Sequence, residues 1–99
     1  MYFLLLYDVV DQFTDRRAPY RDAHLALARA ANERGELLLA GAFAEPADGA
    51  ALVFKAGDQS VAERFAAGDP YVTEGLVKHW TVRKWNVVAG AARDGHPTE

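Results

Sequence analysis

Two separated residues, His24 and Asp69, are the main candidates for chemistry in this chain. The unperturbed pKa of a histidine side chain lies near neutrality, so an imidazole can give or take a proton at physiological pH. A carboxylate can hold that imidazole in one tautomer and stabilise its charged form. If folding brings these two side chains together, they form a pair suited to general acid–base catalysis.

Each member of this pair also has a purely structural interpretation. His24 lies in a run with helical composition, so it can equally be a half-buried histidine packed on apolar neighbours. Asp69 stands directly before Pro70, and aspartate is among the best N-cap residues, with proline favoured at the next position. One carboxylate oxygen can cap a helix while the other binds an imidazole, so the two interpretations of Asp69 are compatible.

Two further residues are candidates for substrate binding. Arg21 precedes His24 by three residues and shares its helical face, so it could hold an oxyanion or a carboxylate. The alternative is a solvated arginine on the helix surface. Tyr71 combines an apolar ring with a hydroxyl and could line a pocket, although core packing explains it equally well.

Other kinds of chemistry find little support in the sequence. The chain contains no cysteine, which excludes disulfides, thiolate catalysis and cysteine-ligated zinc or iron–sulfur sites. The three histidines, His24, His79 and His96, lack the spacing of metal ligands. There is no phosphate-binding loop, dinucleotide-binding fingerprint or Gly-x-Ser-x-Gly turn. We therefore expect no cofactor and no metal.

Length and charge limit the possible partners. With 99 residues the chain has the size of one domain with a single core. The formal net charge of −3, with no basic run longer than two residues, argues against nucleic acid and anionic membranes as partners. The apolar start resembles neither a signal peptide nor a membrane span. We expect a cytoplasmic protein, with which the lack of cysteine is compatible.

The hydrophobic pattern predicts the elements that must position these residues. Strands are expected over 2–10, 37–43, 50–55 and 77–88, helices over 20–34 and 60–68, and a short helical turn at 69–70. Gly35 is expected to end the first helix, and Ser60 with Glu63 to form a capping box on the second. The stripe of the first helix that faces the sheet is predicted as Tyr20, Ala23, Leu27, Ala30, Ala31 and Arg34, with His24 at its border. Residues 11–17 are expected to form a loop, and residues 89–99 a loose tail.

The order of these elements predicts the fold class. The sequence β-α-β-β-α-β is the ferredoxin-like arrangement, an α+β fold in which both helices cover one face of an antiparallel sheet. The strands over 2–10 and 37–43 are apolar on both faces, whereas a sheet with one solvated face should alternate with polar residues. We therefore expect the uncovered face to pair with a second copy in a homodimer. The alternative is a monomer whose polar side chains and C-terminal tail cover that face.

Several short motifs, taken together, resemble one known family. They are Arg21-x-x-His24-Leu25, Leu38-Leu39-Ala40-Gly41, Asp69-Pro70-Tyr71-Val72 and Gly75-Leu76-Val77. In this order they are similar to the YciI-like (YCII-related) family over roughly residues 1–88. The resemblance implies a ferredoxin-like fold, a dimer of the dimeric α+β barrel type, and a site centred on His24 and Asp69. The chain departs from the family where Ala42 and Lys84 stand at positions that often hold proline.

The resemblance also implies a type of activity. One relative in the family is similar to a dehydrochlorinase of a chlorinated aromatic, and muconolactone isomerase shares the barrel. We therefore expect a cofactor-independent lyase or isomerase that uses His24 and Asp69 for proton transfer on a small apolar or aromatic molecule. Arg21 and Tyr71 are its predicted substrate-binding residues. The alternative is a non-catalytic dimeric module that binds a small molecule or serves as an accessory protein.

Overall fold

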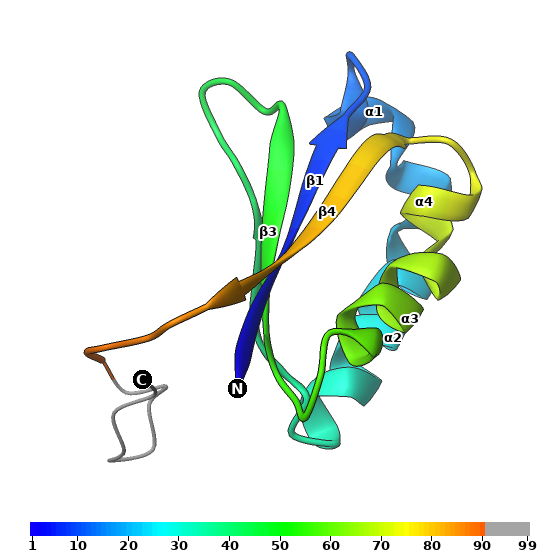
Figure 1. Ribbon diagram of the computed structural model, residues 1–99. Helices are drawn as coiled ribbons and strands as arrows, with labels where there is room; N and C mark the ends of the chain where they lie inside the picture. The colour runs from blue at the N-terminus through cyan, green and yellow to red at the C-terminus, as the bar shows by residue number, and fades with distance from the viewer. Residues whose placement is uncertain (91–99) are drawn as a thin grey trace.

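The structure, a computed structural model, describes residues 1–90 of the chain. Its elements are β1 (Tyr2–Val9), α1 (Phe13–Arg16), the 3-10 helix η1 (Ala18–Tyr20), α2 (Arg21–Glu33), β2 (Leu37–Ala42), β3 (Gly49–Lys55), α3 (Ser60–Gly68), α4 (Pro70–Thr73) and β4 (Val77–Trp85). The four strands form one antiparallel sheet in the order β2-β3-β1-β4. All the helices lie on one side of this sheet (Figure 1). The predicted ferredoxin-like α+β fold is confirmed.

The core lies between the helices and one face of the sheet. On the central strand β1, alternate side chains Phe3, Leu5 and Tyr7 point into this core, as the period of two in a strand requires. They meet Leu52 and Phe54 of the neighbouring strand β3. The helices contribute Ala31, Ala62, Phe65, Ala66 and Tyr71 to the same core. Because Tyr7 belongs to this buried row, its hydroxyl reaches the layer between sheet and helices.

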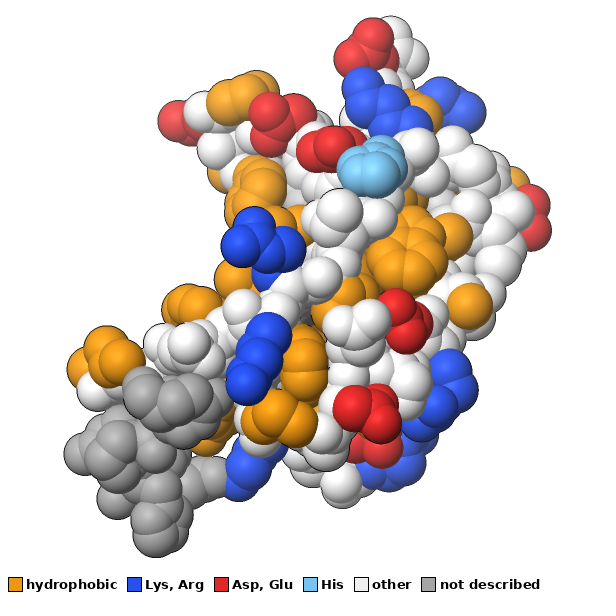
Figure 2. All heavy atoms as spheres, viewed as in Figure 1, with side chains coloured by type: hydrophobic (Ala, Val, Ile, Leu, Met, Phe, Trp, Pro, Cys, Tyr) orange, Lys and Arg blue, Asp and Glu red, His pale blue; other side chains and the backbone are white. Residues whose placement is uncertain are grey.

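The other face of the sheet has no helix over it. Leu4 and Leu6 of β1 point to this face and are only partly buried, as are their β3 neighbours Val53 and Ala51. Leu39 on β2 is 70% exposed. On the face seen in Figure 2, basic side chains lie along the edge formed by β4, and hydrophobic side chains reach the surface on either side of it. On β1 apolar residues therefore occupy both faces of the sheet, as the sequence indicates, whereas β4 places His79, Thr81 and Arg83 on the open face.

Several predicted boundaries differ from the structure. The segment 11–17, predicted as a loop, contains the short helix α1, and η1 follows it before α2 begins at Arg21. The last strand ends at Trp85 rather than at residue 88. The two tryptophans of β4, Trp80 and Trp85, lie opposite Tyr7 and Tyr2 and therefore on opposite faces, as the alternation in the sequence indicates. The expected tail falls mainly on residues 91–99, which lie outside the described residues.

The predicted face of α2 is rotated relative to the observed one. Ala23, assigned to the stripe facing the sheet, is exposed, and the side that packs on the core includes Leu27, Ala28 and Ala31. His24 is half-buried and belongs to this side rather than to its border. Alanines occupy more than half of the circumference of this helix, so hydrophobicity alone defines its inner face poorly.

Two helix-end predictions have different outcomes. Gly35 follows α2 with a φ of +81°, the left-handed conformation expected of a residue that ends a helix. The predicted capping box at α3 is wrong, because the Ser60 hydroxyl donates to the Asp58 carboxylate instead of capping the helix. The same Asp58 oxygen accepts the backbone N–H of Ser60 at 2.8 Å, and Glu63 is bound by the side-chain amide of Gln59.

Within residues 1–90, no helix is long and apolar enough to cross a lipid bilayer.

Candidate active site

A fully buried carboxylate, that of Asp69, is the centre of the candidate site. It stands between α3 and α4, where the chain is extended, and Pro70 begins the short helix α4 behind it. Its Oδ1 atom accepts the backbone N–H of Tyr71 at 3.0 Å, so the predicted N-cap is confirmed. A buried charge is tolerated only when it is hydrogen-bonded or paired, and Asp69 has further partners of both kinds.

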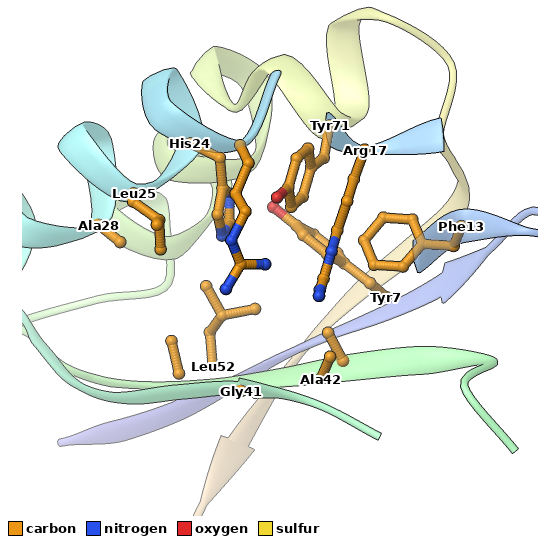
Figure 3. A pocket seen from close by; sticks show the side chains of 13 residues that line it. Tyr7, Phe13, Arg17, His24, Leu25, Ala28, Gly41, Ala42, Leu52 and Tyr71 are labelled. Atoms are coloured by element: carbon orange, nitrogen blue, oxygen red, sulfur yellow. The ribbon is translucent and has the colours of Figure 1, made fainter. Parts of the chain in front are cut away.

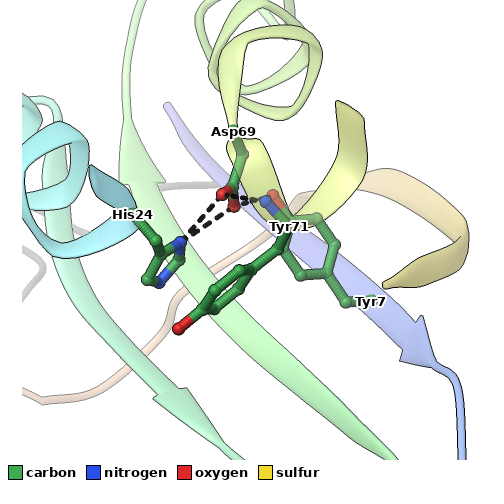
Figure 4. Close-up of polar contacts among 4 residues, drawn as sticks. All are labelled: Tyr7, His24, Asp69 and Tyr71. Atoms are coloured by element: carbon green, nitrogen blue, oxygen red, sulfur yellow. Dashed lines mark hydrogen bonds and ion pairs between the residues drawn. The ribbon is translucent and has the colours of Figure 1, made fainter. Parts of the chain in front are cut away.

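The second partner of Asp69 is His24, from the first turns of α2. The Nδ1 atom of His24 lies 2.9 Å from Oδ1 and 3.1 Å from Oδ2 of Asp69 (Figure 4). The two residues are 45 positions apart in sequence. Because a carboxylate only accepts hydrogen bonds, this contact places the proton of a neutral imidazole on Nδ1 and leaves Nε2 as the basic atom.

Aromatic rings fix the orientation of this imidazole. The ring of Tyr71 stacks on that of His24, with centroids 4.0 Å apart and planes 11° from parallel. Phe65 of α3 meets the imidazole edge-on at a centroid distance of 6.5 Å. The side chain of His24 is 14% exposed, so the ring is held tightly without being sealed from the surface.

The third partner of Asp69 is Tyr7, a residue to which the sequence analysis gave no functional role. Its hydroxyl donates to Oδ2 of Asp69 at 2.7 Å (Figure 4). Burial, together with the charge of Asp69 and this hydrogen bond, raises the pKa of Tyr7 well above its ordinary range. Tyr7 therefore stays a neutral donor at any physiological pH. The available signal was a tyrosine on the buried face of a strand, since such a hydroxyl needs a partner.

A cavity of about 170 Å³ opens beside the imidazole. In Figure 3, His24, Tyr71 and Arg17 reach from the helical layer toward the sheet, where Leu52, Gly41 and Ala42 form the floor. Of the lining residues on β2 and β3, four have at most a methyl side chain, namely Ala40, Gly41, Ala42 and Ala50, and Leu52 has the largest side chain among them. His24 is thus the acid–base group that faces an accessible space.

Three polar groups of this cavity belong to none of the contacts around Asp69. Arg17 and Arg21 both line the cavity, and neither forms a salt bridge within residues 1–90. The hydroxyl of Tyr71 is buried and has no hydrogen-bond partner among the described residues. Burial raises the pKa of Tyr71, while the nearby charges of Arg17 and Arg21 oppose that rise. Arg21 is thus close enough to favour the ionised phenol, but it does not meet the hydroxyl in hydrogen-bonding geometry.

The structure therefore brings together all four residues that the sequence analysis singled out. His24 and Asp69 are in direct contact, and Arg21 and Tyr71 line the adjoining cavity. Arg17 is an addition, because the segment before α2 gave no helical pattern to indicate its direction. His79 lies on the exposed side of β4, and within residues 1–90 no cluster of histidine and acidic side chains could hold a metal ion.

Comparisons with known proteins place this arrangement in a family. No curated protein sequence matches the chain. Among solved structures it is similar to 5-chloro-2-hydroxyhydroquinone dehydrochlorinase (TftG) from Burkholderia phenoliruptrix AC1100, in complex with 2,5-dihydroxybenzoquinone. The two share 20% sequence identity, the match covers 86% of this chain and 93% of that chain, and the TM-score is 0.72. This likeness shows that the chain has the fold of a dimeric α+β barrel subunit. The family model of the YCII-related domain matches residues 1–86, and the chain therefore belongs to the YCII-related family.

Proposed function

We propose that this protein is a cofactor-independent lyase or isomerase in which His24 transfers a proton and Asp69 positions the imidazole. The observation that carries the proposal is the contact between His24 Nδ1 and the buried Asp69, beside an open cavity. A general base needs a basic atom that can reach the substrate, and here that atom is Nε2. The buried carboxylate stabilises the imidazolium that forms when Nε2 takes up a proton.

The chemistry that such a pair can perform is simple to state. In an elimination, Nε2 of His24 removes a proton from the substrate, the released electron pair forms a new π bond, and the leaving group departs with its own bonding pair. In an isomerisation, the imidazolium returns the same proton to another atom. General acid–base catalysis of this kind contributes about 100- to 10,000-fold, so binding and orientation in the cavity must supply the rest.

The size and lining of the cavity favour a small ring as substrate. An apolar cavity of about 150 Å³ holds a benzene molecule, so a space of about 170 Å³ suits a single six-membered ring. The similar solved structure is a dehydrochlorinase in complex with a hydroxylated quinone. We therefore propose hydroxylated, halogen-bearing aromatics as the first class of substrates to examine.

The test is a screen of chlorinated hydroquinones and of lactones, in which chloride release or the change in ultraviolet absorbance is followed. His24→Gln should abolish turnover of any substrate found, because glutamine cannot accept and release a proton at neutral pH. Arg29→Gln is the control, since Arg29 is exposed on α2 and outside the cavity, and it should leave the rate unchanged. Equal rates for wild type and His24→Gln would contradict the assignment of His24.

The alternative is a module that binds a small molecule without converting it. It is favoured by the binding groups of the cavity, Arg17, Arg21 and the Tyr71 hydroxyl, which do not depend on the basic Nε2 atom. Binding that survives in His24→Gln, with no turnover by the wild type of any compound in the screen, would favour this alternative.

We also propose that the open face of the sheet pairs with a second copy of the chain. Apolar side chains on this face, including the 70% exposed Leu39 and the 42% exposed Trp85, support this arrangement, as does the dimeric α+β barrel fold. Sedimentation equilibrium should give twice the mass of one chain. Leu39→Lys should shift the protein toward one chain's mass, whereas a wild-type monomer at micromolar concentration would contradict the proposal.

A further inference from the structure

The cavity holds two positive charges without a matching negative one. Arg17 and Arg21 carry permanent charge at neutral pH, and neither is paired with a carboxylate within residues 1–90. Within residues 1–90 the lining of the cavity contains no aspartate or glutamate, and the carboxylate of Asp69, behind His24, is fully buried and already accepts from Tyr7, Tyr71 and His24. The cavity therefore favours a ligand of negative charge.

A hydrogen-bond donor in the same cavity is also unused. The side chain of Tyr71 is only 3% exposed, and its hydroxyl has no partner among the described residues. Buried polar atoms in native proteins are almost always hydrogen-bonded, and an unpaired one is destabilising. Because Tyr71 lines the cavity, a ligand atom that accepts a hydrogen bond there would satisfy this hydroxyl.

Two of these groups, Arg17 and Tyr71, are held by aromatic contacts with Phe13. The guanidinium of Arg17 lies 5.5 Å from the centroid of the Phe13 ring, whose face holds it in place. Phe13 in turn meets Tyr71 edge-on at 5.2 Å. In Figure 3 the guanidinium of Arg17 and the hydroxyl of Tyr71 both point into the space above the sheet. A guanidinium and a neutral phenol that converge in this way are donors matched to an anionic oxygen.

We propose that Arg17, Arg21 and the hydroxyl of Tyr71 form a binding site for an anionic oxygen of the ligand. The ligand is then an aromatic or quinonoid ring that carries an ionised hydroxyl or a carboxylate. The inference rests on the proposed function only for the ring, which would lie between this anion site and Nε2 of His24. An uncharged apolar molecule would lack the anionic oxygen that this site binds.

The experiment measures equilibrium binding, so it does not depend on turnover. Isothermal titration calorimetry compares two matched pairs of probes. The first pair is 2,5-dihydroxybenzoquinone, whose hydroxyls ionise as vinylogous acids at neutral pH, and the uncharged 2,5-dimethoxybenzoquinone. The second pair is benzoate and benzamide. Preference within the first pair identifies an ionised ring hydroxyl as the ligand group, and preference within the second identifies a carboxylate.

In the wild type, the anionic member of at least one pair should bind more tightly than its neutral partner. A hydrogen bond to a charged group contributes about 1.5–3 kcal/mol, so Arg17→Gln, Arg21→Gln and Tyr71→Phe should each weaken anion binding about 10- to 100-fold. The neutral probes should be affected much less. Arg16→Gln and Arg29→Gln are matched controls, since both arginines are exposed and outside the cavity, and they should change nothing. Thermal unfolding of each variant confirms that it is folded.

The outcomes separate this inference from the proposed function. Binding of the anion that depends on Arg17 and Tyr71 supports the anion site, even if His24→Gln shows that no turnover depends on the imidazole. The inference is overturned if neither pair shows a preference for its anionic member. It is overturned equally if the preference is the same in Arg17→Gln, Arg21→Gln and Tyr71→Phe as in the wild type.

Discussion

The two halves of the cavity differ in how far their polar groups are satisfied. Around Asp69, the carboxylate receives donors from Tyr7, Tyr71 and His24. Around Arg17, the charged and polar groups have no partner of opposite charge within residues 1–90. The first half has its hydrogen bonds formed without a ligand, and one of them holds the imidazole of His24. In the second half these groups are left without such partners, so the two halves should respond differently to substitution.

The largest effect, on turnover, is expected when the carboxylate of Asp69 is replaced. In Asp69→Asn, the amide nitrogen cannot accept, so one of the three present donors loses its acceptor and the preferred tautomer of His24 changes. In a comparable histidine–carboxylate arrangement, this type of change lowers turnover about 10,000-fold. Turnover is one measurement, and nitrogen NMR of the imidazole is another that needs no substrate. An unchanged Nδ1–H tautomer in the variant would contradict the positioning role of Asp69.

A smaller effect, on stability, is expected when the hydrogen bond from Tyr7 of β1 to Asp69 is removed. Tyr7→Phe deletes a hydrogen bond to a buried charge, so the free energy of unfolding should fall by about 1.5–3 kcal/mol. Urea denaturation gives this value. Tyr20→Phe is the control, because Tyr20 packs partly against the same core. If both variants lose the same stability, the bond from Tyr7 to Asp69 contributes nothing of its own.

The raised pKa of Tyr7 makes this stabilisation dependent on pH. In the unfolded chain Tyr7 ionises near its ordinary pKa of about 10, whereas in the folded chain burial and Asp69 keep it protonated. The folded state therefore holds more protons above that pH, and stability falls as the pH rises. Below about pH 10 the contribution is fully present. Denaturation at several alkaline pH values should show the gap between wild type and Tyr7→Phe narrowing, and a constant or widening gap would be the wrong sign.

The smallest effect on stability is expected in the second half. In Tyr71→Phe the ring still stacks on His24, and only a hydroxyl without a described partner is lost. The free energy of unfolding should be unchanged or rise by up to about 1 kcal/mol, because no hydrogen bond is broken. The same urea experiment measures it beside Tyr7→Phe. A loss as large as that in Tyr7→Phe would show that the Tyr71 hydroxyl is already satisfied and would weaken the contrast between the halves.

The sequence was sufficient for the fold but not for the whole site. Periods of two in the strands and of about four in the helices, with Gly35 as a stop signal, predict the order of elements. The contact between His24 and Asp69 was inferred from the family resemblance, because no local rule links residues 45 positions apart. Tyr7 was missed, since a tyrosine within an apolar strand has the same pattern whether or not its hydroxyl binds a carboxylate.

Arg17 and the inner face of α2 were missed for a different reason. Both depend on how a segment rotates against the sheet, which is decided by packing rather than by local preference. The segment before α2 is polar and short, so its fold into α1 and η1 is visible only in the complete structure. Alanines at positions 23, 26, 28, 30 and 31 gave similar hydrophobicity on several sides of α2.

The four small residues on the β2 and β3 side of the cavity have a consequence for redesign. Ala40, Gly41, Ala42 and Ala50 give the ligand space by what their side chains lack, and none of them touches Asp69 through a hydrogen bond. Substitutions that enlarge these side chains by one carbon at a time would reduce the volume of the cavity in small steps. The contact between His24 and Asp69 on the opposite side would stay in place. Under the proposed function, the residues that set the size of the ligand and the residues that transfer the proton would lie on separate elements, so either set could change without the other.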